Sequence, residues 1–338
     1  MKIQENISLK PFNTFGMNVF AKYFASFNST DQLNEILESA KSESSSDLIL
    51  GGGSNILFTK DIDGLVLKNE IEGIDIIEDN EEYVYVKVGA GMNWHQFVLY
   101  CIHHGYAGIE NLALIPGCVG ASPIQNIGAY GVEIKDVFHA LEAFHLRDKM
   151  KMVFSKNDCA FGYRESVFKN KFKNQFAITS VTFRLNKKAQ YHVSYGAINQ
   201  ELESMGIKEL SIISVAQAVM NIRNSKLPNP SLIGNAGSFF KNPEITNEEF
   251  NYLKLSHPSL TGYQTIDNKM KIAAGWLIEQ CGWKGFRDGD AGCYDKQALV
   301  LVNYGNATGQ QVFQLSESII TSVQQQFGIT LQREVNVI

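Results

Sequence analysis

The chain has 338 residues, so at about 100–200 residues per domain we expect two or three packed units. Charged residues make up 19% and hydrophobic residues 44%, with 28 glycines and 7 prolines, which excludes a disordered or collagen-like chain. The formal net charge is -5 and no run of Lys and Arg suggests a phosphate-tracking surface, so nucleic-acid binding is not expected.

The sequence favours a cytoplasmic protein without metal. The first six residues lack the apolar core of a secretory signal. The 5 cysteines and 7 histidines show no zinc or other metal spacing, and free thiols in a reducing compartment fit best. The uncharged stretch 111–132 is long enough for a membrane span, but its glycines, prolines and amides predict buried irregular backbone instead.

In chain order, the first predicted element is an amphipathic helix over residues 31–42, which the capping residues Ser29 and Thr30 precede. A strand over 48–50 leads through glycines into an apolar run over 56–58, so these glycines join strand to strand. Alternation over 83–88 predicts a further strand. Asn93 then caps a helix that ends at Gly105.

Beyond the uncharged stretch, the pattern predicts a mixed α+β region and then a domain boundary. Strands are expected over 140–146, 152–154 and 176–185, with a loop over 161–166. A helix over 214–224 ends before Pro228 and Pro230, where we place the boundary.

The last part of the chain is predicted to contain three helices and a terminal strand. A capping box from Thr246 to Glu249 starts the first helix, and further helices are expected over 271–281 and 308–327, the last ending at Gly328. Residues 329–338 look like a lone strand that has to pair with an existing sheet.

Two glycine-rich motifs suggest a ligand cradle. Gly51-Gly52-Gly53-Ser54-Asn55 offers consecutive backbone amides suited to a pyrophosphate, although most loops of this kind are only tight turns. Residues 115–131, Ile-Pro-Gly-Cys-Val-Gly-Ala-Ser-Pro-Ile-Gln-Asn-Ile-Gly-Ala-Tyr-Gly, allow close backbone approach to a flat ligand, the alternative being a buried crossing loop. The fingerprints of a Rossmann fold and of a P-loop are absent.

Three polar residues stand out as candidates for chemistry. Ser238 lies in Gly-Asn-Ala-Gly-Ser-Phe-Phe-Lys-Asn-Pro, where it is either a turn cap or a proton donor in a dry site. Arg164 lies in an aromatic-flanked loop as either a structural ion pair or an anion clamp. Glu334 lies on the expected terminal strand, where a solvated side chain is the alternative to a functional one.

Taken together, these motifs and Tyr-Arg-Glu-Ser occur in the order found in UDP-N-acetylenolpyruvoylglucosamine reductases. From residues 9–16 to Glu334 the chain closely resembles that family. The resemblance implies a flavoenzyme of bacterial peptidoglycan synthesis, in which NADPH reduces bound FAD. The reduced flavin then converts the enolpyruvyl ether of UDP-N-acetylglucosamine to UDP-N-acetylmuramate.

The resemblance also implies an α+β fold with a two-part FAD-binding region of the vanillyl-alcohol-oxidase type and a C-terminal α+β substrate-binding domain. The expected divisions are residues 1–70 with 329–338, residues 71–223, and residues 224–328. The expected FAD contacts come from the two glycine motifs: Gly51, Gly52, Gly53, Ser54, Asn55, Pro116, Gly117, Gly120, Ser122, Pro123, Asn126 and Gly128.

The family's catalytic roles fall on three residues of this chain. The general acid corresponds to Ser238, the active-site arginine to Arg164 and the active-site glutamate to Glu334. Hydride transfer adds negative charge to the substrate, so groups that favour that charge are catalytic. We therefore expect Arg164 to stabilise the enolate and Glu334 to be protonated in the working complex.

Tyr195 in Ser-Tyr-Gly resembles the tyrosine loop of the family's longer type and would contact the diphosphate; Lys226 and Asn242 match other substrate or NADPH contacts. Two departures from the family pattern are Arg333, where a proline is common before the glutamate, and the charged loop 287–290. They leave open the side-chain geometry of Glu334 and the contacts of that loop.

Two alternatives to the reductase remain: an oxidase on the same flavin scaffold, and a non-catalytic protein that binds flavin or nucleotide sugar. The expected small-molecule partners are UDP-N-acetylglucosamine enolpyruvate and NADPH. No nucleic acid, membrane insertion or obligate protein partner is expected.

Overall fold

The computed structural model describes residues 3–39, 48–265 and 267–338, which form two compact units. Unit 1 consists of Met1–Ser8, Phe20–Gly53 and Ile62–Ser225. Unit 2 consists of Leu9–Val19, Ser54–Asp61 and Lys226–Ile338. Both units are therefore built from three separate stretches of the chain.

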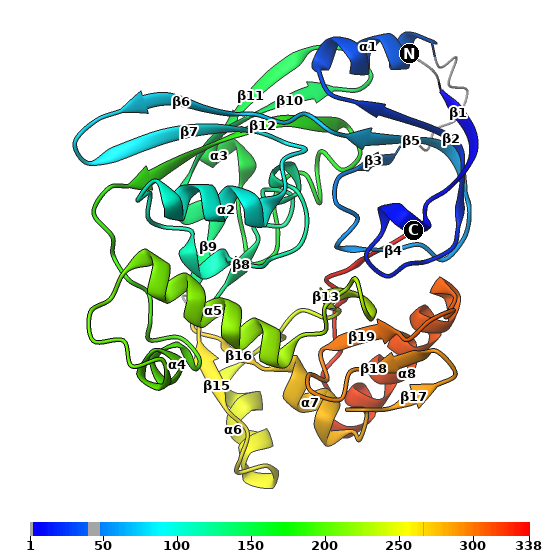
Figure 1. Ribbon diagram of the computed structural model, residues 1–338. Helices are drawn as coiled ribbons and strands as arrows, with labels where there is room; N and C mark the ends of the chain where they lie inside the picture. The colour runs from blue at the N-terminus through cyan, green and yellow to red at the C-terminus, as the bar shows by residue number, and fades with distance from the viewer. Residues whose placement is uncertain (1–2, 40–47, 266) are drawn as a thin grey trace. The chain divides into compact units, whose positions relative to one another are not determined.

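The first sheet of unit 1 has four strands in the order β1-β2-β5-β3 (Figure 1). Its strands are β1 (Gln4–Ser8), β2 (Phe20–Phe27), β5 (Ile62–Asn69) and β3 (Leu48–Leu50). Helix α1 (Thr30–Ser39) packs Leu33 and Ile36 into a small core with Phe27 and Leu67. This confirms the described part of the first predicted helix, whose last three residues lie outside the described ranges.

The second sheet of unit 1 has five antiparallel strands in the order β11-β10-β12-β7-β6. They are β6 (Ile74–Asp79), β7 (Tyr83–Gly89), β10 (Phe138–His145), β11 (Lys151–Ser155) and β12 (Phe176–Asn186). The central strand β12 is buried along most of its length, as expected for a strand covered on both faces. The strands predicted in these regions are confirmed, with shifts of a few residues at their ends.

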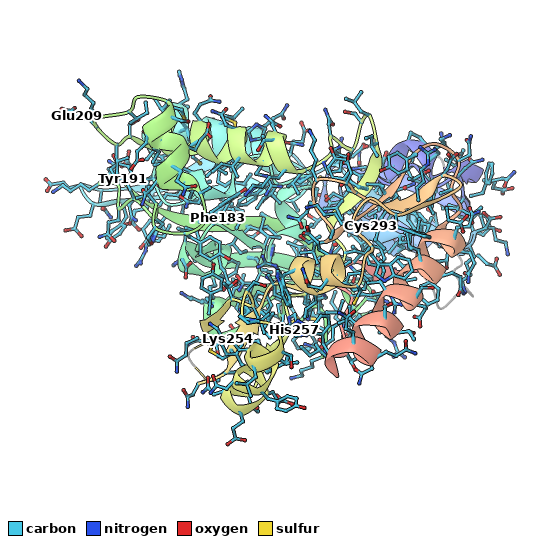
Figure 2. The ribbon with its side chains drawn as sticks, turned by 90° about the horizontal axis from the view of Figure 1, so that it is seen from below. Phe183, Tyr191, Glu209, Lys254, His257 and Cys293 are labelled. Atoms are coloured by element: carbon cyan, nitrogen blue, oxygen red, sulfur yellow. The ribbon has the colours of Figure 1, made fainter. Side chains whose placement is uncertain are left out.

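Helix α2 (Trp94–His103) lies along one face of this sheet (Figure 1). Asn93 caps it by accepting a hydrogen bond from the Gln96 amide, as the sequence predicts. The rings of Trp94 and Phe97 pack on Phe183, the β12 residue labelled in Figure 2. These side chains are wholly or almost wholly buried and belong to a core cluster of unit 1.

The uncharged stretch 111–132 is irregular backbone, as predicted, and much of it is buried. It contains the 3-10 turns η2 (Glu110–Leu112) and η3 (Val119–Ala121) and enters the hairpin β8 (Gly128–Ala129) and β9 (Val132–Glu133). The rest of unit 1 comprises η4 (Ile134–Asp136), α3 (Lys156–Cys159), α4 (Ile198–Ser204) and α5 (Ile212–Lys226), whose last residue is assigned to unit 2.

Unit 2 contains a four-stranded sheet, β13-β19-β18-β17, and a three-stranded sheet, β14-β16-β15. The strands are β13 (Gly234–Ser238), β14 (Glu244–Ile245), β15 (Gly262–Gln264), β16 (Met270–Ile272), β17 (Arg287–Asp288), β18 (Ala291–Cys293) and β19 (Val300–Asn303). A 3-10 turn, η1 (Lys10–Phe12), comes from its first segment.

Three helices cover unit 2: α6 (Asn247–Ser256), α7 (Ala274–Gln280) and α8 (Gly309–Phe327). The capping box of Thr246 and Glu249 and the left-handed stop at Gly328 are confirmed. The prediction of a helix starting at residue 271 is wrong, because Lys271 pairs with Glu244 and Tyr263 in a sheet and the helix starts at Ala274.

The C-terminal segment is extended, but only part of it forms a ladder. Strand β20 (Asn336–Val337) pairs in parallel with β4 (Ile56–Leu57), and the Ile338 carbonyl accepts from the Thr59 amide. The terminal strand therefore finds a partner, but it forms a separate two-stranded sheet with β4 where the sequence predicts pairing with an existing sheet, and it is shorter than residues 329–338. Among the described residues, no helix has both the length and the apolarity needed to cross a membrane.

Candidate active site

The turn Gly51–Gly53 and the loop at Gly117 close on each other in unit 1. A Cβ placed on Gly52 would lie 2.8 Å from the Gly117 Cα, so a side chain at this position would collide with backbone. Gly53 has a φ of +60° and Gly117 a φ of +120°, conformations that favour glycine. The sequence therefore needs glycine here for contact between the two loops.

Hydrogen bonds fix the Gly117 loop onto its neighbours in unit 1. The Gly117 carbonyl accepts from the Trp94 amide at 3.0 Å, and the Gly120 amide donates to the Ala90 carbonyl at 2.9 Å. Ser122 donates its hydroxyl to the Val119 carbonyl at 2.7 Å and is buried. Gly51, Gly52 and Gly53 of the first predicted motif therefore lie beside the second motif in unit 1. The last two residues of the first motif, Ser54 and Asn55, belong to unit 2.

Arg164 is held by the end of the same irregular stretch. One guanidinium nitrogen donates to the Gly128 carbonyl at 2.5 Å, and another lies 3.6 Å from the Glu133 carboxylate. Arg164 has a φ of +54°. The side chain of Asn126 donates both to Glu133 and to the Gly162 carbonyl at 3.0 Å, which ties the arginine's turn to the loop.

Glu133 was not singled out by the sequence, although it contacts three predicted or nearby polar groups. Its carboxylate accepts from Asn126, lies 2.7 Å from the Lys135 ammonium and pairs with Arg164. The available signal was that Glu133 is the first charged residue after the uncharged stretch. Of the two readings of Arg164, the ion pair is present, and the anion clamp stays a prediction.

In unit 2, the structure brings Ser238 and Glu334 onto adjacent backbone segments. Ser238 ends β13 at a register shift, after Gly237 with a φ of +69°. Such bulges re-aim a side chain within a sheet. The Glu334 amide donates to the carbonyl of Phe239, the residue after Ser238, at 2.8 Å. Both Ser238 and Glu334 are half-buried.

The C-terminal segment is held on both sides of Glu334. The Asn55 side chain donates to the Glu334 carbonyl at 3.4 Å, and the Asn55 carbonyl accepts from the Asn336 amide at 3.1 Å. Asn55, predicted as a flavin contact, therefore also anchors the segment that contains Glu334.

Arg333, the first departure from the family pattern, is fixed on α8. Its Nε donates to the buried Ser316 hydroxyl at 2.9 Å, and its terminal nitrogen pairs with Glu317. The guanidinium also lies 4.7 Å from the centre of the Phe313 ring. The added cation is therefore neutralised by α8.

The charged loop 287–290, the second departure, also satisfies its own charges. Arg287 pairs with Asp290 at 3.0 Å and donates to the Gly289 carbonyl at 2.7 Å. Its guanidinium lies 4.3 Å from the centre of the Tyr304 ring, and Asp290 accepts from the Asn306 amide. These contacts close a hairpin of β17 and β18.

The three predicted substrate contacts lie at the surface or close to it. Tyr195, in unit 1, is 47% exposed and sits beside Gly131, where an added Cβ would lie 3.3 Å from its Cβ. Lys226 is the exposed last residue of α5. The side-chain oxygen of Asn242 accepts from the Ala274 amide at 2.9 Å and so caps the start of α7. The side-chain nitrogen is the group that Asn242 can use to donate a hydrogen bond to a ligand.

The histidines and acidic residues of the described ranges form no cluster of three or more suited to a metal ion. His257 illustrates the structural role predicted for most of them. At the end of α6 in Figure 2, it packs against the rings of Trp276 and Phe327.

Comparison with known families matches two parts of the chain. Residues 21–148 match an FAD binding domain. Residues 229–338 match the C-terminal domain of UDP-N-acetylenolpyruvoylglucosamine reductase.

Full-length relatives decide the family. The chain is 48% identical to the UDP-N-acetylenolpyruvoylglucosamine reductases of Amoebophilus asiaticus and Flavobacterium johnsoniae, with 100% of each chain covered. The chain belongs to the UDP-N-acetylenolpyruvoylglucosamine reductase family. The crystal structure of the family member from Thermus caldophilus shares its fold, with a TM-score of 0.70 at 24% identity, covering 100% of this chain and 99% of that one.

Family membership confirms the predicted fold class and the FAD cofactor. The residues of unit 1 also fit a flat cofactor on structural grounds. The Gly52 amide donates no hydrogen bond to any other described residue, and glycines bring the two loops together without side chains. The buried Ser180 hydroxyl, on the strand against which η3 packs, has no partner among the described residues. Such unpaired groups are suited to the heteroatoms of a flavin.

Proposed function

We propose that this chain is a cytoplasmic FAD enzyme that uses NADPH to reduce UDP-N-acetylglucosamine enolpyruvate to UDP-N-acetylmuramate for peptidoglycan synthesis. The observation that supports this most strongly is the 48% identity, over the whole chain, to reductases named for this substrate. The bound FAD would accept hydride from NADPH and supply it to the enolpyruvyl group.

Reduction of the enolpyruvyl ether places specific demands on the protein. Hydride arrives at the terminal methylene, and the electron pair of the double bond moves onto the adjacent carbon and its carboxylate. The transition state is therefore richer in negative charge than the substrate, and one proton has to reach that carbon.

We assign these tasks to three residues. Arg164 stabilises the added charge by charge-assisted hydrogen bonds, helped by the Gly128 carbonyl and Glu133, which hold its guanidinium in place. Ser238 donates the proton, and the register shift before it at the end of β13 supports this role because such irregularities re-aim side chains within a sheet. A protonated Glu334, on the neighbouring segment, stabilises the carboxylate without repelling it.

Substrate recognition is proposed for Tyr195, Lys226 and Asn242. The exposed ring of Tyr195, with its small-residue neighbours Gly131 and Gly196, supports membership of the longer type with a tyrosine loop. Asn242 would bind through its amide nitrogen because its oxygen already accepts from Ala274. The three-domain division, with residues 224–328 as the substrate-binding domain, is part of the same proposal.

The cofactor and the reaction can be tested separately. Purified protein should be yellow with one FAD per chain, and NADPH should bleach it under anaerobic conditions. Steady consumption of NADPH should then require the enolpyruvyl sugar nucleotide. Rapid reoxidation by air without that substrate would favour an oxidase, and a colourless protein that does not bind FAD would contradict the proposal.

The serine assignment predicts a split between the two half-reactions. Ser238→Ala should leave the reduction of FAD by NADPH within about twofold of the wild type, whereas reduction of the enolpyruvyl substrate should fall by roughly 100-fold or more, as expected for loss of a general acid. Stopped-flow absorbance of the flavin measures both steps.

Ser318→Ala, on the exposed side of α8, is the matched control and should affect neither step. An unaffected second half-reaction in Ser238→Ala would remove Ser238 from the mechanism.

A further inference from the structure

Arg223, on the inner side of α5, is a cation to which no described residue offers a hydrogen bond or an ion pair. It lies eight residues after Val215 and four after Val219, both of which are buried. Arg223 therefore lies on the same buried face of the helix as these two valines. Its Nε is buried and makes no hydrogen bond, and Arg223 forms no ion pair with any described residue. The residue as a whole is half-buried, so solvent reaches part of it.

The groups around Arg223 are neutral. Its charge acts on the Tyr130 phenol and on the His95 imidazole, while burial lowers the pKa of His95 and raises that of Tyr130. His95 accepts from the Leu114 amide at 3.1 Å, which leaves its other nitrogen as the protonated one. Neither neighbour offers the guanidinium a negative charge.

A second unpaired atom is linked to the same place. The Asn111 side chain donates to the Tyr130 carbonyl at 3.0 Å and to the His192 carbonyl at 2.7 Å. Its oxygen, however, is buried without a hydrogen bond to any described residue. Tyr130 is thus linked to both groups: its carbonyl accepts from Asn111, and its phenol lies in the field of Arg223.

A guanidinium whose Nε is buried and unpaired is costly unless an anion occupies the position beside it. Its planar set of donors suits phosphate oxygens, and the Asn111 oxygen suits a hydroxyl or N–H donor. A nucleotide supplies both kinds of group on one molecule. We propose that Arg223, together with Tyr130 and Asn111, binds a phosphate group of a nucleotide ligand of this enzyme.

The identity of the nucleotide rests on the proposed function, which provides two sources of phosphate: NADPH and the sugar nucleotide. The Arg164 and Arg223 regions are connected through the β8–β9 hairpin. Gly128 at its start accepts from Arg164, and Tyr130 at its turn lies in the field of Arg223. A phosphate bound at Arg223 would thus help to fix the hairpin that holds Arg164.

The decisive variant is Arg223→Met, which keeps the length of the side chain and removes its charge. We expect the dissociation constant of the nucleotide bound at Arg223 to rise about ten- to 100-fold, as for loss of a charge-assisted hydrogen bond. Without ligand, the melting temperature should be unchanged or higher, because an unpaired buried charge has been removed. A purely structural arginine predicts the opposite: a lower melting temperature and unchanged binding.

The experiment uses the FAD-loaded enzyme and three probes: NADPH, the enolpyruvyl sugar nucleotide and inorganic pyrophosphate. Calorimetry measures binding of the sugar nucleotide and pyrophosphate, and the concentration dependence of anaerobic flavin reduction measures NADPH binding. A change for NADPH alone assigns the site to the dinucleotide, and a change for the sugar nucleotide alone assigns it to the substrate. Arg223→Lys, which retains the charge without the planar donor set, should give an intermediate loss.

Arg184→Met is the matched control, since Arg184 is an exposed arginine of unit 1 stacked on the Tyr83 ring. It should leave all three dissociation constants unchanged. If Arg223→Met and Arg223→Lys bind every probe within twofold of the wild type, the phosphate site is excluded. Failure of the wild type to turn over the sugar nucleotide, with pyrophosphate binding still dependent on Arg223, would overturn the proposed function and retain the site.

Discussion

Arg333 matters to the proposed reaction because it precedes Glu334 and holds that part of the chain in place. Its side chain is fixed by Ser316, Glu317 and the Phe313 ring, and the next residue is Glu334. We predict that Arg333→Met lowers the rate of substrate reduction roughly ten- to 100-fold, because small displacements of a catalytic group have effects of that size. Flavin reduction by NADPH should change little.

Arg287→Met is the control for this prediction, since Arg287 also stacks on a ring, that of Tyr304, in unit 2. Glu317→Gln should reproduce part of the Arg333→Met effect. Equal losses in both half-reactions would mean that Arg333 supports the fold of unit 2 in general.

The residues of the candidate site were predictable where a motif marks them and not where only three-dimensional contacts do. Ser238 and Arg164 stand in motifs, Glu334 is marked by the family resemblance alone, and the structure gives each a defined backbone setting. Glu133 and Asn111 act through partners distant in sequence, which no local pattern reveals. Arg223 did leave a signal, a charge on the apolar face of a helix, but reading it requires knowing that no partner approaches.

At the scale of elements, the contact between the Gly51–Gly53 turn and the Gly117 loop can be tested directly. In Gly52→Ala, the added methyl group would meet the Gly117 backbone at 2.8 Å, so the two loops would have to separate. We predict that purified Gly52→Ala retains well under half of the wild-type FAD content, measured by flavin absorbance after denaturation.

Gly51→Ala gives the informative comparison, because its methyl group would meet the Cys118 side chain at an ordinary 3.6 Å. It should retain more FAD than Gly52→Ala. Equal FAD content in the two variants would show that the close approach at Gly52 is not needed for binding.

Helices were easier to predict than strands because their ends carry chemical signals. Asn93, Thr246 and Gly328 cap or stop helices where the sequence places them. The two-residue strands β8, β9 and β20 have no pattern of their own, since pairing with a partner defines them. The helix predicted from residue 271 failed for the same reason: pairing with β14 and β15 extends the backbone at Lys271.

For the molecule as a whole, the reactivity of the cysteine thiols measures how tightly their surroundings are packed. Burial raises the pKa of Cys159 and of Cys293 to about 12, and it raises that of Cys101 well above its usual value. Thiolate is the reactive form, so these groups should be inert at pH 8. Burial also raises the pKa of Cys118 and that of Cys281, but Cys281 is only half-buried and is the most accessible of the 5.

We therefore predict that Ellman's reagent labels one thiol of the native protein faster than the other four at pH 8, and all 5 after unfolding in guanidinium without reductant. Cys281→Ser should remove the fast phase and leave the other four. Fewer than five thiols in the unfolded protein would reveal a disulfide, and several fast thiols in the native protein would contradict the packing of these residues.

The discontinuity of the two units has a consequence for how the protein is made. All segments of unit 1 have been synthesised once residue 225 is reached, whereas unit 2 needs Lys226–Ile338 in addition to Leu9–Val19 and Ser54–Asp61. The Thr59 amide, in one of the early segments, donates its hydrogen bond to the carbonyl of Ile338. On the ribosome, the early segments of unit 2 therefore meet their partners in Lys226–Ile338 only after that stretch has been synthesised, and the segment containing Glu334 is set in place late.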